Sequence, residues 1–134
     1  MRKPKALILC IIDDDFGLDT RKELLQLSGY EVLTAQGGQK GLGLFIEHPI
    51  DAVVLDKRMN RDRVANQMKS LKPHIPILML SAYGLSTKEL KCVDAFLSKG
   101  ESWSKVVSTL DRLLNSRLPL FFRWLEDWKH QQNQ

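Results

Sequence analysis

The sequence predicts an α/β domain in which helices cover both faces of a parallel β-sheet. Two observations support this prediction. Five short apolar runs, each about the length of one strand, alternate with segments whose apolar residues recur at helical spacing. The first run, residues 6–12, is apolar throughout, as expected of a strand that is buried on both faces. Regular alternation of strand and helix favours parallel neighbours joined by right-handed crossovers.

The first helix is expected over residues 18–28, directly after the first strand. Its inward residues are Leu24 and Leu25, and Gly29 follows at the point where a glycine commonly ends a helix. The next segment, residues 30–35, alternates between apolar and polar residues. This period of two predicts the second strand.

A second helix is expected over residues 38–47, although Gly41 and Gly43 lower its intrinsic stability. Residues 51–55 form the third apolar run and predict the third strand. The helix after it is indicated by three apolar residues that share one helical face. These residues are Val64, Met68 and Leu71.

The last part of the predicted domain contains two strands, over residues 75–80 and 93–97, with a short helix at about 87–92 between them. Pro73 and Pro76 bracket the turn that leads into the fourth strand. The clearest helical stripe of the chain comes last. It consists of Trp103, Val106, Val107, Leu110, Leu113 and Leu114.

Composition indicates one cytoplasmic domain with a real core. The chain has 134 residues, of which 43% are apolar, and a net charge of +4 that is spread along the sequence. This charge pattern does not point to nucleic acid as a partner. The run over residues 6–12 is too short for a secretory signal and leads into three aspartates. Cys10 and Cys92 lie in or near apolar segments and are expected to be reduced.

Polar residues follow four of the five apolar runs. Because the carboxyl ends of parallel strands converge on one crevice, these side chains are expected to meet there. They are Asp13, Asp14, Asp15, Asp56, Ser81 and Lys99. Carboxylates at about 4 Å repel by roughly 4 kcal/mol per pair at an effective dielectric constant of 20, so the cluster needs a cation. Mg²⁺ suits it, because Mg²⁺ binds carboxylates together with phosphate.

This arrangement predicts phosphoryl chemistry at Asp56. Asp13 and Asp14 could hold the metal, and the Asp56 carboxylate could attack phosphorus to form an acyl phosphate. Lys99 would offset charge on the phosphoryl oxygens, and Ser81 would donate a hydrogen bond to one of them. The simpler alternative is that the aspartates after the first strand only favour a helix N-terminus.

Five stretches of the chain resemble the response-regulator receiver domain of two-component signalling, over about residues 5–115. They are "LILCIIDDD", "GYEVLTAQGGQKGL", "DAVVLDKRM", "IPILMLSAYG" and "DAFLSKG". The resemblance implies a doubly wound, flavodoxin-like sheet with strand order 2-1-3-4-5. It also implies a phosphoacceptor at Asp56 and a phosphate-binding lysine at Lys99. The implied Mg²⁺ ligands are Asp13, Asp14, Asp56 and the main-chain carbonyl of Arg58, and the implied switch residues are Ser81 and Phe96.

The chain departs from the family pattern in four places, all outside the acidic site. The loop after Met59 is short and lacks the usual proline and glycine, so the following helix could start early. The stretch between Ser81 and Lys99 is also short, which predicts a stunted fourth helix, and Gly100 replaces the proline of a cis peptide. Phe96 has no hydroxyl to donate on switching.

Residues 116–134 are expected to form a separate helical extension that packs on the domain or on a second copy of the chain. The apolar face of this extension consists of Leu118, Phe121, Trp124, Leu125 and Trp128. An interfacial membrane helix is the alternative, but the polar face carries acids as well as bases and is not strongly basic.

The sequence therefore predicts a stand-alone, atypical response regulator that is not an enzyme in the usual sense. Its expected partners are a sensor histidine kinase or a phosphotransfer protein, and a downstream protein target, with a homodimer possible. The alternative is a degenerate receiver that is never phosphorylated and dimerises through its tail. A phosphatase-like hydrolase on the same fold is less compatible with the pairing of Ser81 and Lys99.

Overall fold

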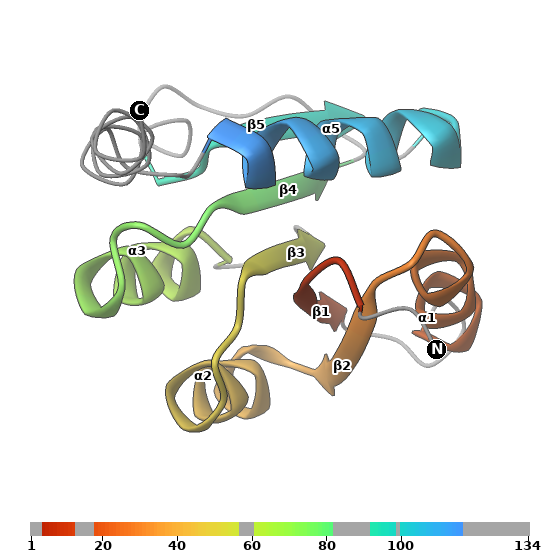
Figure 1. The fold of residues 1–134 in the computed structure, drawn as a ribbon. Coiled ribbons are helices and arrows are strands. Elements are labelled where there is room, and N and C mark those ends of the chain that lie inside the picture. The colour runs from red at the N-terminus through yellow and green to blue at the C-terminus, as the bar shows by residue number, and fades with distance from the viewer. Residues whose placement is uncertain (1–3, 13–17, 57–60, 82–91, 99, 117–134) are drawn as a thin grey trace, which may run out of the picture.

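The fold is a five-stranded parallel sheet with helices on both faces (Figure 1). The computed structural model describes residues 4–12, 18–56, 61–81, 92–98 and 100–116. The strand order β2-β1-β3-β4-β5 confirms the predicted flavodoxin-like order. The strands are β1 (Leu7–Ile12), β2 (Glu31–Gln36), β3 (Ala52–Asp56), β4 (Ile77–Ser81) and β5 (Ala95–Ser98).

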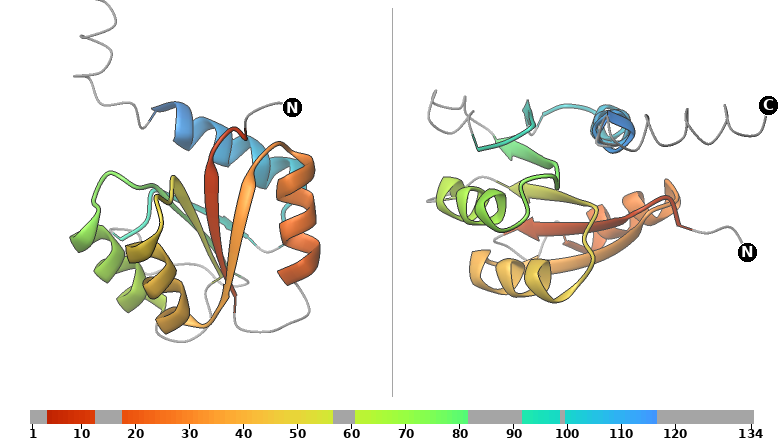
Figure 2. Two further views of the ribbon diagram at one scale, coloured as in Figure 1. Left: turned by 60° about the horizontal axis from the view of Figure 1, so that its bottom comes forward. Right: turned by 60° about the vertical axis from the view of Figure 1, so that its left-hand side comes forward.

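Among the described helices, α1 (Leu18–Leu27) and α5 (Trp103–Ser116) pack on one face of the sheet, and α2 (Gly38–Glu47) and α3 (Arg61–Leu71) pack on the other (Figure 2). Successive side chains of a strand point to opposite faces. Accordingly, Ile8 and Cys10 of β1 belong to the core under α1 and α5, whereas Leu9 and Ile11 belong to the core under α2 and α3.

The predicted stripe on the last helix is the one that α5 buries. Val106 and Leu110 are buried, and the other members of the stripe pack half-buried against the same core. These others are Trp103, Val107, Leu113 and Leu114. Since the stripe faces the even-numbered residues of β1, it fixes which face of the sheet α5 covers.

Two glycines have specific backbone roles. Gly29 has a φ of +99°, a conformation that favours glycine, and it ends the turn between α1 and β2. Gly41 is buried in α2, and a Cβ atom there would collide with the side chain of Ile11. From the sequence Gly41 only weakens its helix, but the structure shows that it lets α2 approach β1.

One expectation differs from the structure. Leu71, which the sequence places on the apolar face of its helix, is 53% exposed, so the buried face of α3 is narrower than expected. Leu71 is the last residue of α3 and, with Leu42, lines a depression between α2 and α3 rather than the core. Of the short helix expected at about 87–92, only Cys92 is described and it lies in a turn; residues 87–91 lie outside the described ranges, so this helix stays a prediction.

Several other expectations can be tested only in part. α3 begins at Arg61, five residues after the end of β3, which agrees with an early helix start. No cis peptide occurs in the described part of the chain, and both cysteines there are free thiols. None of the described helices is long and apolar enough to cross a membrane. Beyond Ser116 the tail lies outside the described residues.

Candidate functional site

Two of the predicted site residues end neighbouring strands at the carboxyl edge of the sheet. Asp56 is the last residue of β3, and Ser81 is the last residue of β4. The register pairs Asp56 with Leu80, so the two site residues lie next to each other along this edge. Both are buried, with exposed fractions of 7% for Asp56 and 1% for Ser81. The structure therefore brings the predicted phosphoacceptor and switch hydroxyl to one edge of the sheet.

The predicted aromatic switch residue lies farther from this edge. Phe96 is the second residue of β5, pairs with Met79 and is half-buried. Ser98, which ends β5, pairs with Ser81. Lys99 follows directly in the sequence but lies outside the described residues. The described end of β5 therefore lies beside Ser81.

The expected metal ligands are described only at Asp56. β1 ends at Ile12, and because Ile11 pairs with Leu55, Ile12 lies beside Asp56. The remaining expected ligands, Asp13, Asp14 and Arg58, lie outside the described residues. Within the described ranges no group of three or more His, Cys, Asp or Glu side chains could hold a metal ion. The metal assignment remains a prediction.

Arg21, which the sequence analysis did not single out, contacts the Asp56 carboxylate. Its Nη1 donates a hydrogen bond to Oδ2 of Asp56 over 3.2 Å, so the two side chains form an ion pair. The pair is largely shielded from water, with 20% of the Arg21 side chain and 9% of the Asp56 side chain exposed. A mostly buried cation therefore lies at the predicted phosphoacceptor.

The placement of Arg21 follows from its position on α1. Leu25 of this helix is fully buried, and Arg21 precedes it by four residues, so both lie on the inward face. α1 runs back across the sheet after β1, so its N-terminal turns lie nearest the carboxyl edge. The signal available in the sequence was an arginine one turn before a buried leucine, on the helix that follows the first acidic cluster.

Cys10 of β1 lies close to the Arg21–Asp56 ion pair. Burial raises the pKa of the Cys10 thiol to about 11. The Arg21 guanidinium, by its charge and a hydrogen bond, acts in the opposite direction on this pKa, and the Asp56 carboxylate raises it further. The thiol is therefore neutral at ordinary pH, and the Arg21 guanidinium lies close to both Cys10 and Asp56.

Comparison with known proteins decides the family. A family model for the response regulator receiver domain matches residues 8–110. This chain belongs to that family. Receiver domains act in two-component signal transduction and are signalling modules rather than conventional enzymes, as the resemblance implied.

Curated relatives of this receiver domain differ greatly in length. The transcriptional regulatory protein GlrR of Escherichia coli K12 is 29% identical over 133 aligned residues, which cover 92% of this chain but 30% of GlrR. The polar-differentiation response regulator DivK of Brucella anthropi is 24% identical, and the match covers 83% of this chain and 97% of DivK. The chain thus spans under a third of one relative and nearly all of another.

Solved receiver structures share the fold throughout the sheet. The response regulator TrrA of Thermotoga maritima, solved in complex with Mg²⁺-BeF, has a TM-score of 0.76 and 27% identity. The match covers 81% of this chain and 98% of TrrA. TrrA was also solved in complex with the histidine kinase ThkA, and that copy gives a TM-score of 0.75 and 28% identity, with the same coverage.

Proposed function

We propose that this receiver domain accepts a phosphoryl group on Asp56 from a histidine kinase or a phosphotransfer histidine, and signals through protein contacts. The observation that supports this most directly is the placement of Asp56, a nearly buried carboxylate at the carboxyl end of β3, beside Ser81. A buried carboxylate needs a counterion, and this one already has a cation at 3.2 Å. A phosphoryl group also binds cations, so a carboxylate that already lies beside a cation is a suitable place to accept one.

The proposed chemistry is a phosphoryl transfer from nitrogen to oxygen. An Asp56 carboxylate oxygen attacks the phosphorus of a phosphohistidine, a P–O bond forms, and the P–N bond breaks. The imidazole nitrogen keeps the electron pair and takes up a proton. Ser81 is suited to donate its hydroxyl hydrogen to a phosphoryl oxygen, and Lys99 to offset the charge of another.

Magnesium is the proposed cofactor, and the described donor chemistry fits it. Asp56 provides a carboxylate oxygen at the edge beside the end of β1, where Asp13 and Asp14 follow in the sequence. These three carboxylates and the carbonyl of Arg58 would hold the ion. When bound, Mg²⁺ would offset negative charge on the transferring phosphoryl group. TrrA, solved with Mg²⁺-BeF, supports this proposal by analogy.

The proposed partner is a histidine kinase, by analogy with TrrA, which was solved in complex with one. We further propose that this receiver domain works in the cytoplasm. Residues 116–134 are proposed to pack on the receiver domain of residues 1–115 or on a second copy of the chain.

The test is transfer of a phosphoryl group to the full chain. The protein is incubated with Mg²⁺ and either acetyl phosphate or a phosphorylated histidine kinase, and its intact mass is measured. Wild type is expected to gain one phosphoryl group, and Asp56→Asn none. Asp111→Asn, which changes an aspartate of α5, serves as the matched control and should be labelled like wild type. Equal labelling of Asp56→Asn and wild type would refute the assignment.

A second candidate function is favoured by the Arg21 contact. If the Arg21–Asp56 pair were permanent, the domain would act as an interaction module that is never phosphorylated. In that case no donor would label the protein, and the chain would still adopt its fold and bind its partner.

A further inference from the structure

Arg21 reaches the proposed phosphoacceptor from α1, a helix that carries none of the other proposed site residues. Its guanidinium donates to the Asp56 carboxylate at 3.2 Å and lies close to the Cys10 thiol. This contact joins the helix after β1 to the end of β3, across 35 residues of sequence. It therefore depends on the tertiary fold and is not a local helix contact.

Packing alone does not account for an arginine at this place. The inward face of α1 is apolar at Leu25, one turn away, and an aliphatic side chain would suit the same core. Arginine is rarely buried unless it is paired, because removing its charge from water is costly. The Arg21 side chain is four-fifths buried, and its ion pair is with Asp56.

The helix itself does not favour a cation there either. α1 begins at Leu18, so Arg21 is the fourth residue of the helix. The positive end of the helix dipole lies in this region, where anions are stabilised and cations are not. The interaction that offsets burial and dipole is the one with Asp56. The placement of Arg21 is therefore best explained by the charge of the phosphoacceptor.

We propose that Arg21 is the resident counterion of Asp56 in the unphosphorylated protein, and that it competes with the divalent cation for the Asp56 carboxylate. This inference rests on the proposed function and specifies its regulation. Arg21 sets how much Mg²⁺ the site requires, because the ion gains full access to Asp56 only when the guanidinium withdraws. The two cations also repel each other at this short range.

The competition between Arg21 and Mg²⁺ can be measured as a change in the Mg²⁺ dissociation constant. The apparent affinity for a ligand falls by the fraction of molecules in the competent state. If the Arg21–Asp56 pair is closed in about 80–90% of molecules, removing the arginine tightens Mg²⁺ binding about five- to tenfold. Removing a positive charge elsewhere on the same helix should have little effect on Mg²⁺ affinity, since a charge farther from the Asp56 carboxylate is screened by salt.

The experiment measures Mg²⁺ affinity of the full chain by calorimetry, without any phosphoryl donor. Arg21→Gln removes the charge, Arg21→Lys keeps a positive charge, and Lys22→Gln is the matched control on the neighbouring residue. The dissociation constant of Arg21→Gln is expected to fall about five- to tenfold, and that of Lys22→Gln to change less than about twofold. The value for Arg21→Lys should lie between wild type and Arg21→Gln.

Wild-type protein provides an independent measurement if Arg21→Gln fails to fold. The Nε–H signal of Arg21 in a ¹⁵N-resolved spectrum should shift as Mg²⁺ is added, with the same midpoint as the Asp56 amide. An Arg21 signal unchanged at saturating Mg²⁺ would overturn the proposal. The proposal would also be overturned if Arg21→Gln bound Mg²⁺ with the same affinity as Lys22→Gln, or more weakly than wild type. A failure of every variant to bind Mg²⁺ would overturn it as well.

The same proteins separate this inference from the proposed function. If Arg21→Gln binds Mg²⁺ more tightly but acetyl phosphate labels neither it nor wild type, Arg21 is the counterion and the phosphoacceptor function is wrong. If Asp56 is labelled but Arg21 does not affect Mg²⁺ affinity, the function stands and the counterion proposal is wrong.

Discussion

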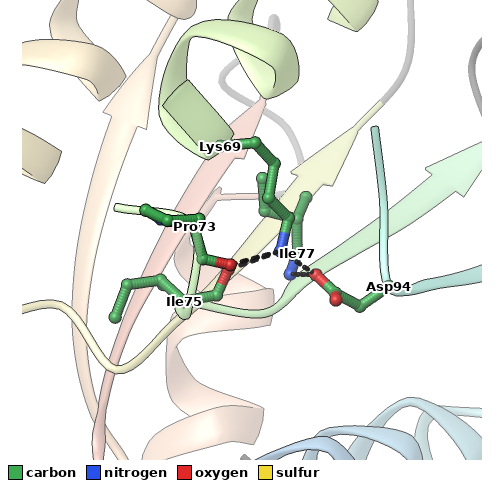
Figure 3. A network of polar contacts seen from close by, with 5 residues as sticks. All are labelled: Lys69, Pro73, Ile75, Ile77 and Asp94. Carbon is green, nitrogen blue, oxygen red and sulfur yellow. Dashed lines mark hydrogen bonds and ion pairs between the residues drawn. The ribbon is translucent and has the colours of Figure 1, made fainter. Parts of the chain in front are cut away.

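The two edges of the sheet each contain an ion pair, and the two pairs are built differently. At the carboxyl edge the Arg21–Asp56 pair is largely buried. At the amino edge the Lys69–Asp94 pair is more open, with 22% and 36% of the side chains exposed, and it is part of a network of backbone contacts (Figure 3). The difference separates an ion pair within a network of backbone contacts from one that involves the proposed phosphoacceptor.

The amino-edge network ties α3 to the starts of β4 and β5. Lys69 of α3 donates to the carbonyl of Ile75 at 2.9 Å and to the Asp94 carboxylate. The same carboxylate accepts the backbone N–H of Ile77, the first residue of β4, at 2.7 Å. In Figure 3 the side chains of Lys69 and Asp94 thus bind backbone groups at the start of β4 as well as each other.

A second aspartate repeats this arrangement at the start of β3. Asp51 accepts the backbone N–H of Leu7 at 2.8 Å, and its own N–H donates to the Leu7 carbonyl at 2.8 Å. Asp51 and Asp94 each precede a strand and bind the first residue of the neighbouring strand. Both aspartates at the amino edge therefore accept backbone N–H groups, and Asp94 also binds Lys69, whereas Asp56 at the carboxyl edge binds the side chain of Arg21.

The largest stability effect is expected at the amino edge. Asp94→Ala removes the acceptor of the buried Ile77 N–H and the partner of Lys69, which should lower the free energy of unfolding by about 1–3 kcal/mol. Asp94→Asn keeps an oxygen acceptor and should cost less. Urea unfolding measures both. Because the network is remote from Asp56, phosphoryl acceptance by folded Asp94→Ala should match wild type. If Asp94→Ala lost phosphoryl labelling but kept its stability, the amino-edge network would serve the phosphoacceptor rather than the fold.

A smaller effect, and one that depends on Mg²⁺, is expected at the carboxyl edge. Arg21→Gln removes the Arg21 guanidinium from the Asp56 carboxylate, which should lower stability by about 1–2 kcal/mol in chelator, less than for a fully buried pair because Arg21 is partly exposed. Saturating Mg²⁺ should remove most of this deficit, since a ligand that binds the folded state stabilises it. Thermal melts with and without Mg²⁺ measure the difference. An equal deficit in both conditions would give Arg21 a purely structural role.

The smallest effect at neutral pH concerns Cys10 beneath the Arg21–Asp56 pair. Because burial raises its folded pKa from 9.0 to about 11, the neutral thiol contributes stability that is fully present below pH 9 and lost as the pH rises through 11. At pH 8 an alkylating reagent should modify the half-buried Cys92 and spare Cys10. Peptide mass analysis distinguishes the two sites. Rapid native-state alkylation of Cys10 would show that the carboxyl-edge core is more open than described.

The sheet could be predicted from the sequence because its signals are local. Apolar runs of strand length and the stripe of α5 each report burial of one element, and the motif at Asp56 and Ser81 reports the end of a strand. The strand order came from the family resemblance and was confirmed. Predicting these features does not require knowing which side chains contact one another.

Features that depend on two distant elements were not predicted. Arg21 looks like any helix arginine until the fold brings α1 beside β1 and β3. Gly41 looks like a defect until Ile11 is seen against it. Asp51 and Asp94 are parts of the family-like stretches, but their hydrogen bonds to strand starts emerge only from the register. Spacing along the chain carries no information on such contacts.

The most direct test of the account is to map where a phosphoryl mimic acts on the sheet. Amide spectra of the full chain are recorded with Mg²⁺, before and after addition of beryllofluoride. The largest shifts are expected at the carboxyl edge, at Ile12, Arg21, Asp56 and Ser81, whereas Asp51 and Asp94 should shift little. No response, or shifts centred on the amino edge, would contradict the assignment of Asp56 as the phosphoacceptor.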